Sequence, residues 1–368
     1  MKSTDKISLF QLGTLIIIFI LGTSIIITPE IDLAGRNGWI TDLVATGLAL
    51  AYLALLFFLD TDLKLNILEV AESCFGRWLG ILIGFLYFFY FVHLGALTLR
   101  IIGDFLLTTI LPGMPLGVFT FSLTLTAAYA ISRGVKTIGR VGELIFPAVL
   151  FIFILLIVLA IPQYDFTNLL PIERNYREIG QATYSIWAFA FGDLIILSFL
   201  IPYLKGDGDK NSKSYVGLYL LGATFLGGLV LTFRTLVLTV VMGGELASLF
   251  TYPIFSMVGT IQVGDFLERL EVFFLVMWIG SVFVKLLLAF WSSIESLAYL
   301  SKTQEKTSFL FPVGIIMVGM AQLLFESFGE EYNFVLKSWP FYSSIFVLII
   351  PLLVILAVSL KRLAGRGE

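Results

Sequence analysis

Two charged residues inside otherwise apolar stretches are the side chains of this chain that could do chemistry. Lys285 has 13 uncharged residues before it and nine after it, and Asp193 directly follows Gly192 within another apolar run. A charge that faces lipid at the middle of a membrane costs about 2.5–3.5 kcal/mol, so such residues are functional hypotheses by default. Their chemistry would be ion pairing and the recognition of a charged ligand.

Catalysis and metal binding find little support. The chain has one histidine, His93, and one cysteine, Cys74. These leave no credible pair of nucleophile and base, no cysteine-cluster or conventional zinc site, and no internal disulfide framework. A net charge of −3 offers no basic patch for nucleic acid. We therefore expect no enzymatic activity, no cofactor, no metal and no nucleic-acid partner.

The composition predicts an integral membrane protein. Of the 368 residues 58% are hydrophobic and only 13% are charged, against about 25% charged in soluble domains. Lys2 and Lys6 before an apolar run resemble a signal peptide, but the run is too long and no small-residue cleavage site follows, so we expect a retained span. Charge-poor runs predict ten spans, at 7–29, 37–59, 78–103, 116–132, 142–161, 180–203, 215–242, 270–297, 308–327 and 340–360.

The distribution of Lys and Arg predicts the orientation. With the N-terminus inside, 15 of these residues lie in inner segments and 5, among them Arg174 and Arg177, in outer ones. Basic residues favour the cytoplasmic side, so we expect both termini in the cytoplasm.

The first span carries a weak point for a helix. Gly22, Thr23 and Ser24 stand within 23 uncharged residues that end at Pro29. Glycine costs about 1 kcal/mol in a helix interior, and Thr and Ser compete for backbone hydrogen bonds. The helix could open there and expose backbone groups to a ligand, as in discontinuous transporter helices. The alternative is a small-residue face that packs against a neighbouring helix.

Ten spans divide into two sets of five. Because five is an odd number, the two sets cross the membrane in opposite orientations, as in an inverted repeat. We expect one membrane domain, 1–368, with repeats at 1–161 and 180–360. The sixth span then echoes the first, because Gly192 stands mid-span and Pro202 ends it. Between the seventh and eighth spans, residues 243–266 are too interrupted to cross, and we expect either a broken outer lid or a surface loop.

Ordered motifs along the whole chain resemble the B subunits of spore germinant receptors, nutrient-sensing permease-like proteins of the amino acid-polyamine-organocation superfamily. The motifs are Gly22 with Pro29, Gly38-Trp39-Ile40, Arg100 followed by Leu111-Pro112-Gly113-Met114-Pro115, Gly134 to Arg140 with Phe146-Pro147, Phe191-Gly192-Asp193, and Glu268-Arg269-Leu270-Glu271 with Phe273-Phe274-Leu275 and Trp278-Ile279. One departure is Gly22-Thr23-Ser24, where many relatives carry a second small residue two positions after the first glycine. The germinant is therefore not inferred from any relative.

The resemblance implies an all-α membrane fold of ten helices, a LeuT-like 5+5 inverted repeat with broken helices 1 and 6. It also implies a germinant site around spans 1, 3, 6, 8 and 10. The partners it implies are an A subunit, a lipoprotein C subunit, a small-molecule germinant and the lipid of the inner spore membrane.

Within such a fold we expect the N-terminal end of one half-helix to face a carboxylate of the ligand. Free backbone carbonyls of the other half-helix would face an ammonium of the ligand, and an amino acid has both groups. The predicted ligand-binding residues are Gly22, Thr23, Ser24, Tyr90, Ala190, Phe191, Gly192, Asp193, Ser281, Lys285 and Phe346.

Several of these residues have a structural alternative. Phe191 is a gate or ordinary packing, and Asp193 is an amine partner or a tie between half-helices. Lys285 is a fixed cation that holds the opened first span, in place of sodium, through carbonyls near Gly22 or through Ser24. Alternatively it pairs with Asp193 or Glu295.

Three residues outside this set also have expected roles. Arg100 and Asp104 are expected to pair, with each other or with Glu268 and Arg269, and His93 to be hydrogen-bonded core. Three functions remain open at this point: a nutrient receptor subunit, a proton-coupled amino acid permease and a structural assembly subunit.

Overall fold

The computed structural model describes residues 6–24, 27–59, 65–172, 175–205, 213–261 and 269–365. Within these ranges the chain is helical, and its only strand-like pairing is an isolated bridge between Ile7 and Leu204. The α-helices are α1 (Leu9–Ser24), α2 (Pro29–Ala34), α3 (Gly38–Leu59), α4 (Ile67–Phe75), α5 (Arg77–Thr109), α6 (Leu116–Ser132), α7 (Val135–Ala160), α8 (Tyr176–Ile186), α9 (Leu197–Leu200), α10 (Lys213–Met242), α11 (Gly244–Ala247), α12 (Pro253–Thr260), α13 (Glu271–Ser301), α14 (Leu310–Leu323), α15 (Phe328–Asn333), α16 (Trp339–Ser344) and α17 (Ile350–Gly365).

Eight helical stretches in the described residues are long and apolar enough to cross a membrane. They are Pro29–Phe57, Arg77–Thr109, Val135–Gln163, Tyr176–Tyr203, Ser214–Met242, Glu271–Ser301, Lys306–Leu323 and Phe328–Leu363. Two further apolar helices, Leu9–Thr23 and Leu116–Ser132, lie within the predicted spans 7–29 and 116–132, but each is shorter than 18 residues. The prediction of an all-helical membrane protein is confirmed, while the count of ten spans stays a prediction.

The first predicted span is interrupted, but not where the sequence suggested. Gly22 and Thr23 remain helical, and the chain is non-helical at Ile27 and Thr28 before α2 begins at Pro29. Proline suits the first turn of a helix because its missing N–H has no intrahelical partner there. The expected opening at Gly22 is therefore wrong.

The stretch Tyr176–Tyr203 is irregular at its predicted glycine. After α8, a π-helical turn covers Trp187–Phe191 and a 3₁₀ segment covers Gly192–Ile196. Such turns inside a helix often mark functional positions.

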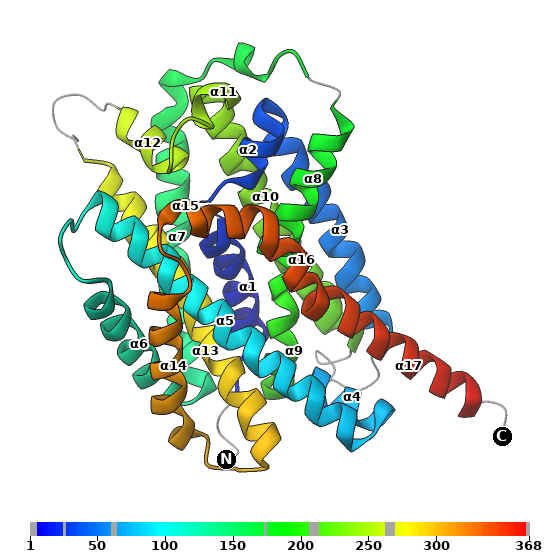
Figure 1. Cartoon of the computed structure of the whole chain (residues 1–368). Helices are drawn as coiled ribbons and strands as arrows, with labels where there is room; N and C mark the ends of the chain where they lie inside the picture. The colour runs from blue at the N-terminus through cyan, green and yellow to red at the C-terminus, as the bar shows by residue number, and fades with distance from the viewer. Residues whose placement is uncertain are drawn as a thin grey trace.

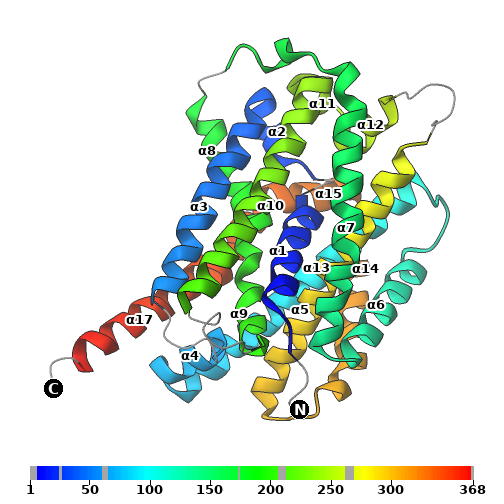
Figure 2. The same cartoon turned by 180° about the vertical axis from the view of Figure 1, so that it is seen from behind.

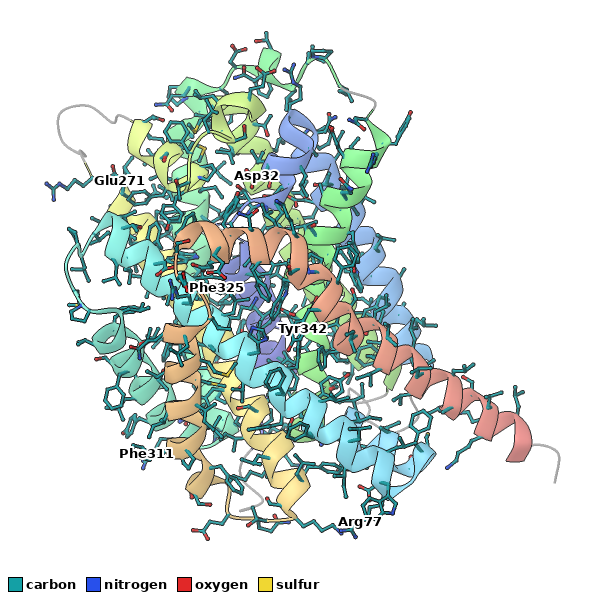
Figure 3. All side chains as sticks on the ribbon, in the orientation of Figure 1. Asp32, Arg77, Glu271, Phe311, Phe325 and Tyr342 are labelled. Atoms are coloured by element: carbon teal, nitrogen blue, oxygen red, sulfur yellow. The ribbon has the colours of Figure 1, made fainter. Side chains whose placement is uncertain are left out.

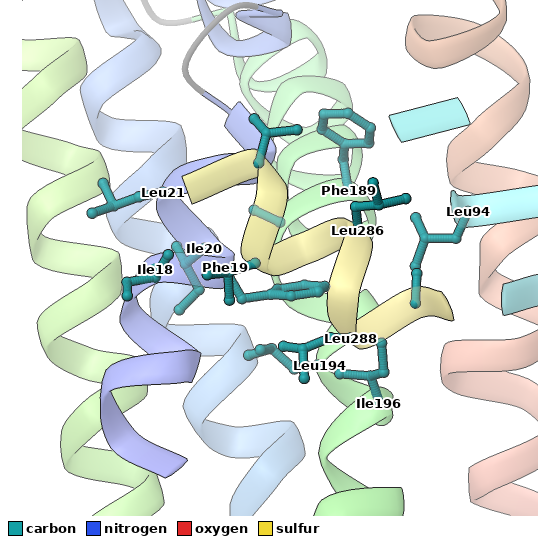
Figure 4. Close-up of a cluster of buried hydrophobic side chains, with 14 of the residues drawn as sticks. Ile18, Phe19, Ile20, Leu21, Leu94, Phe189, Leu194, Ile196, Leu286 and Leu288 are labelled. Carbon is teal, nitrogen blue, oxygen red and sulfur yellow. The ribbon is translucent and has the colours of Figure 1, made fainter. Parts of the chain in front are cut away.

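Helix α1 lies in the middle of the molecule, where it packs against α7, α10 and α13 (Figures 1 and 2). A close-up of this core shows the Phe19 side chain of α1 reaching toward Leu288 of α13 (Figure 4). The start of α1 and the end of α17 both lie toward the lower end of the molecule in Figure 1.

The sequence analysis did not predict helix α4. Asn66 accepts hydrogen bonds from the backbone N–H groups of Leu68 and Glu69, and the Glu69 side chain accepts one from the Asn66 N–H. This capping box fixes the start of the helix and was readable as Asn-x-x-Glu.

The segment predicted as a broken lid or a loop forms two short helices, α11 and α12, as far as residue 261. Tyr252, just before α12, packs edge-on against Phe105 of α5 with ring centroids 4.8 Å apart. The rest of that segment, 262–266, lies outside the described residues.

Candidate functional site

The ammonium of Lys285 links the two interrupted stretches. Its Nζ atom lies 3.0 Å from Oγ1 of Thr23 on α1 and 3.1 Å from Oδ2 of Asp193 on the 3₁₀ segment. The side chains of Lys285 and Asp193 are only 4% and 0% exposed. A buried ion pair needs close geometry and further hydrogen bonds to offset the cost of leaving water, and this pair has both.

Aromatic faces complete the surroundings of the ammonium. The Lys285 Nζ atom lies 4.8 Å from the ring centroid of Phe189 and 5.2 Å from that of Phe19. These distances suit cation–π attraction, which is strongest when the cation is desolvated. The hydroxyl of Thr23 donates to the carbonyl oxygen of Phe19 at 2.7 Å, so its lone pairs are left to accept from Lys285.

Tyr90 of α5 connects the ion pair to the C-terminal helices. Its hydroxyl donates to Oδ1 of Asp193, so both carboxylate oxygens have a donor. The Tyr90 ring stacks on Phe346 with centroids 4.5 Å apart, and the carbonyl oxygen of Phe346 accepts from Tyr87 at 2.7 Å. Tyr342, which Figure 3 shows near the middle of the molecule, lies 6.0 Å from Tyr90, ring to ring.

Of the predicted residues, the structure brings Thr23, Tyr90, Asp193, Lys285 and Phe346 into this cluster. Their role in ligand binding stays a prediction. The side chain of Ser24 lies outside the described residues, so its predicted bond with Lys285 stays a prediction.

The predicted glycines serve close packing in this structure. A Cβ atom at Gly22 would lie 2.6 Å from the carbonyl oxygen of Ser281, so only glycine lets α1 and α13 approach this closely. The Ser281 hydroxyl itself donates to the carbonyl oxygen of Met277 at 2.8 Å. A Cβ at Gly192 would lie 2.7 Å from Cγ2 of Val347. The packing interpretation of Gly22 is therefore the one that the geometry supports.

Ala190 and Phe191 lie in the π-helical turn and are buried. Since both side chains are enclosed by protein, the packing interpretation of Phe191 describes this conformation, and its role as a gate stays a prediction.

Of three further expectations, one is confirmed and two are wrong. The predicted pair of Arg100 and Asp104 is confirmed at 2.8 Å. Glu295 lies 2.5 Å from Lys306, so the alternative in which Glu295 is the partner of Lys285 is wrong. His93 is buried among aromatic rings, and in the described part of the chain neither of its nitrogens has a hydrogen-bond partner, contrary to the hydrogen-bonded core role expected.

Sequence reasoning missed a second buried polar cluster, formed by Glu30, Asp42, Arg234 and Thr235. Glu30 directly follows the first predicted span and Asp42 lies inside the second, and the sequence analysis singled out neither of them. Arg234 within the seventh span was the signal, because an intramembrane arginine needs an acidic partner.

Long apolar helices around a buried ion pair are typical of a polytopic helical membrane protein. The chain belongs to the spore germination protein family (spore permease), whose family model matches residues 6–327. This confirms the resemblance found in the sequence.

Three relatives from Bacillus subtilis (strain 168) illustrate the similarity. The chain is 29% identical to spore germination protein KB over 378 residues, which cover 99% of this chain and 98% of the relative. It is 24% identical to spore germination protein YndE, covering 99% of each chain, and 22% identical to spore germination protein B2, covering 100% of this chain and 99% of the relative.

Proposed function

We propose that this chain is the nutrient-sensing subunit of a spore germinant receptor and binds a small zwitterion, most simply an amino acid, beside Lys285 and Asp193. The observation that carries the proposal is the Lys285 ammonium bound to Thr23 on one interrupted stretch and to Asp193 on the other. The family supplies the biological setting, spore germination.

The ion pair offers complementary partners to a zwitterion. An entering ammonium finds the carboxylate of Asp193, and an entering carboxylate finds the ammonium of Lys285. A zwitterion that binds between the two residues pairs its ammonium with Asp193 and its carboxylate with Lys285. One buried ion pair then becomes two, so no charge is left uncompensated. Lys285 also stands as a fixed cation beside the end of α1, so ligand binding in this proposal does not require sodium.

Ligand binding is proposed to change the junction between α1 and the irregular stretch Tyr176–Tyr203. Lys285 contacts both, so a ligand that displaces one contact alters how they are tied together. A conformational change follows only when the ligand prefers one arrangement over the other. The receptor would pass that preference to its partner subunits.

The finer architecture belongs to the same proposal. We place ten spans in a LeuT-like arrangement of two inverted repeats, supported by the interruptions after Ser24 and at Trp187–Ile196. Both termini are proposed to be cytoplasmic, in the inner spore membrane, with an A subunit and a lipoprotein C subunit as partners.

The test uses the full chain purified into lipid nanodiscs. Thermal unfolding is measured with each common amino acid, and the compound with the largest shift is then used for equilibrium binding and for uptake into proteoliposomes. A receptor subunit binds that compound without accumulating it. Accumulation inside the vesicles would identify a permease, and a lack of binding to any compound that triggers the spores would favour a purely structural subunit.

A further inference from the structure

A second buried cluster, distinct from the ion pair at Lys285, joins three helices. Glu30 lies on α2, Asp42 on α3, and Arg234 and Thr235 on α10. All four are buried, and Glu30 and Asp42 are completely enclosed. Helix α2, which continues the interrupted first stretch, is thus bound to α3 and α10 by charged groups.

Both carboxyl groups converge on the same two donors. The Nη2 atom of Arg234 contacts Oε1 of Glu30 and lies 3.7 Å from Oδ2 of Asp42. The hydroxyl of Thr235 donates to Oδ2 of Asp42 at 2.5 Å and lies 3.4 Å from Oε1 of Glu30. Arg234 also donates to that hydroxyl at 2.7 Å.

The charges of the cluster do not balance. Two ionised carboxylates against one guanidinium would leave a net negative charge inside the protein. The second oxygens, Oε2 of Glu30 and Oδ1 of Asp42, are buried and have no hydrogen-bond partner among the described residues. A buried carboxyl group is costliest when its charge is uncompensated and its oxygens lack hydrogen bonds. Protonation of the group removes that charge.

Among the residues that the structure describes, neighbouring elements bring no further positive charge into the cluster. On α2, Asp32 adds another carboxyl group, and the Tyr332 hydroxyl of α15 donates to it. Arg36, just after α2, binds Glu245 at 2.7 Å and the carbonyl oxygen of Leu170.

On α8, which packs against α2, the charged residues Arg177 and Glu178 are exposed. On α10, the next polar side chain, Thr239, donates to the carbonyl oxygen of Thr235.

We propose that Glu30 and Asp42 form a proton-binding site that holds one proton in the conformation seen here. With that proton, one carboxylic acid and one carboxylate face one guanidinium, and the cluster is neutral. Release of the proton to water would leave two carboxylates against Arg234, so α2 would be held less firmly to α3 and α10. The site is separate from the proposed function and does not depend on the identity of any ligand.

Infrared spectroscopy of the full chain in lipid nanodiscs tests the proposal, because a protonated carboxyl group has a carbonyl stretching band that a carboxylate lacks. Spectra are taken near neutral pH for the wild type, Glu30→Gln and Asp42→Asn, with Asp165→Asn in an exposed loop as the control. The wild type should show a band, sensitive to deuterium exchange, that at least one of the first two variants removes and the control retains. If the wild type shows no such band, or if both variants retain it, the proposal is wrong.

Protein levels give an independent readout. Either amide mimics a protonated carboxyl group and leaves one carboxylate for the guanidinium, so each single variant should reach the membrane at wild-type level. The double variant Glu30→Gln with Asp42→Asn leaves Arg234 without a carboxylate in this cluster and should be lost. If both single variants are lost as well, both carboxylates must be ionised in the folded protein, which overturns the proposal.

Discussion

The Nζ atom of Lys285 lies 3.1 Å from Oδ2 of Asp193, although 92 residues separate them in the sequence. Both side chains are buried, and the same ammonium also binds Thr23 on α1. One ammonium group therefore joins the long helix α13 to the two interrupted stretches.

Removing one charge from this pair should destabilise the protein strongly. We expect Lys285→Met or Asp193→Asn to cost about 3–5 kcal/mol, because each leaves a buried charge without its partner. The double variant should recover most of that loss. Thermal unfolding in detergent or nanodiscs measures it, with Lys337→Met, an exposed lysine, as the matched control. If the double variant is less stable than both single variants, the pair is not the cause of the loss.

Gly22→Ala should lower the amount of protein in the membrane. Even one methyl group at this position would lie 2.6 Å from the carbonyl oxygen of Ser281 and force α1 away from α13. Gly222→Ala is the control, since no atom lies within 4 Å of a Cβ there. Immunoblotting of membrane fractions provides the measurement. Wild-type levels of Gly22→Ala together with a lost germination response would instead favour direct contact of this backbone with the ligand.

Tyr90→Phe should have a smaller effect than loss of the ion pair. The ring keeps its stacking on Phe346, while Asp193 loses one of its two donors. A hydrogen bond to a charged group contributes about 1.5–3 kcal/mol, so the unfolding temperature should fall measurably but less than for Lys285→Met. An unchanged unfolding temperature would show that the Tyr90 hydroxyl does not support Asp193.

Cysteine labelling tests the orientation. In a Cys74→Ser background, a cysteine at position 177 should react with an impermeant reagent added outside, and one at position 302 should react only after the membrane is opened. The expectation follows from the excess of Lys and Arg in the segments assigned to the inside. Labelling of position 302 in intact cells would reverse the assignment.

Much of the fold was predictable because the length and polarity of a membrane helix are properties of a continuous stretch. The predicted span 215–242 matches α10 (Lys213–Met242), and the predicted span 116–132 matches α6 (Leu116–Ser132). The position of the first interruption was not predictable in this way. Glycine and threonine weaken an isolated helix, but close packing of Gly22 on Ser281 of α13 outweighs this local preference here.

For the candidate site, the sequence analysis predicted which residues take part but not which of them pair with one another. Apolar surroundings marked Lys285 and Asp193 as unusual, yet the sequence left Asp193 and Glu295 as equal candidates for the partner of Lys285. Only the folded chain shows that Glu295 pairs with Lys306. Arg234 carried the same signal as Lys285, but its partners lie about 200 residues earlier in the sequence, beyond any local pattern.

Equilibrium binding in sodium-free buffer tests whether Lys285 and Asp193 bind the ligand. The amino acid that gives the largest thermal shift is titrated into full-length wild type and into the double variant Lys285→Met with Asp193→Asn, which should fold and yet lack both charges. We expect saturable binding by the wild type without sodium. The double variant should lose at least about two orders of magnitude in affinity, because it lacks two charged contacts. Equal affinity of the two proteins would contradict a binding site at Lys285 and Asp193.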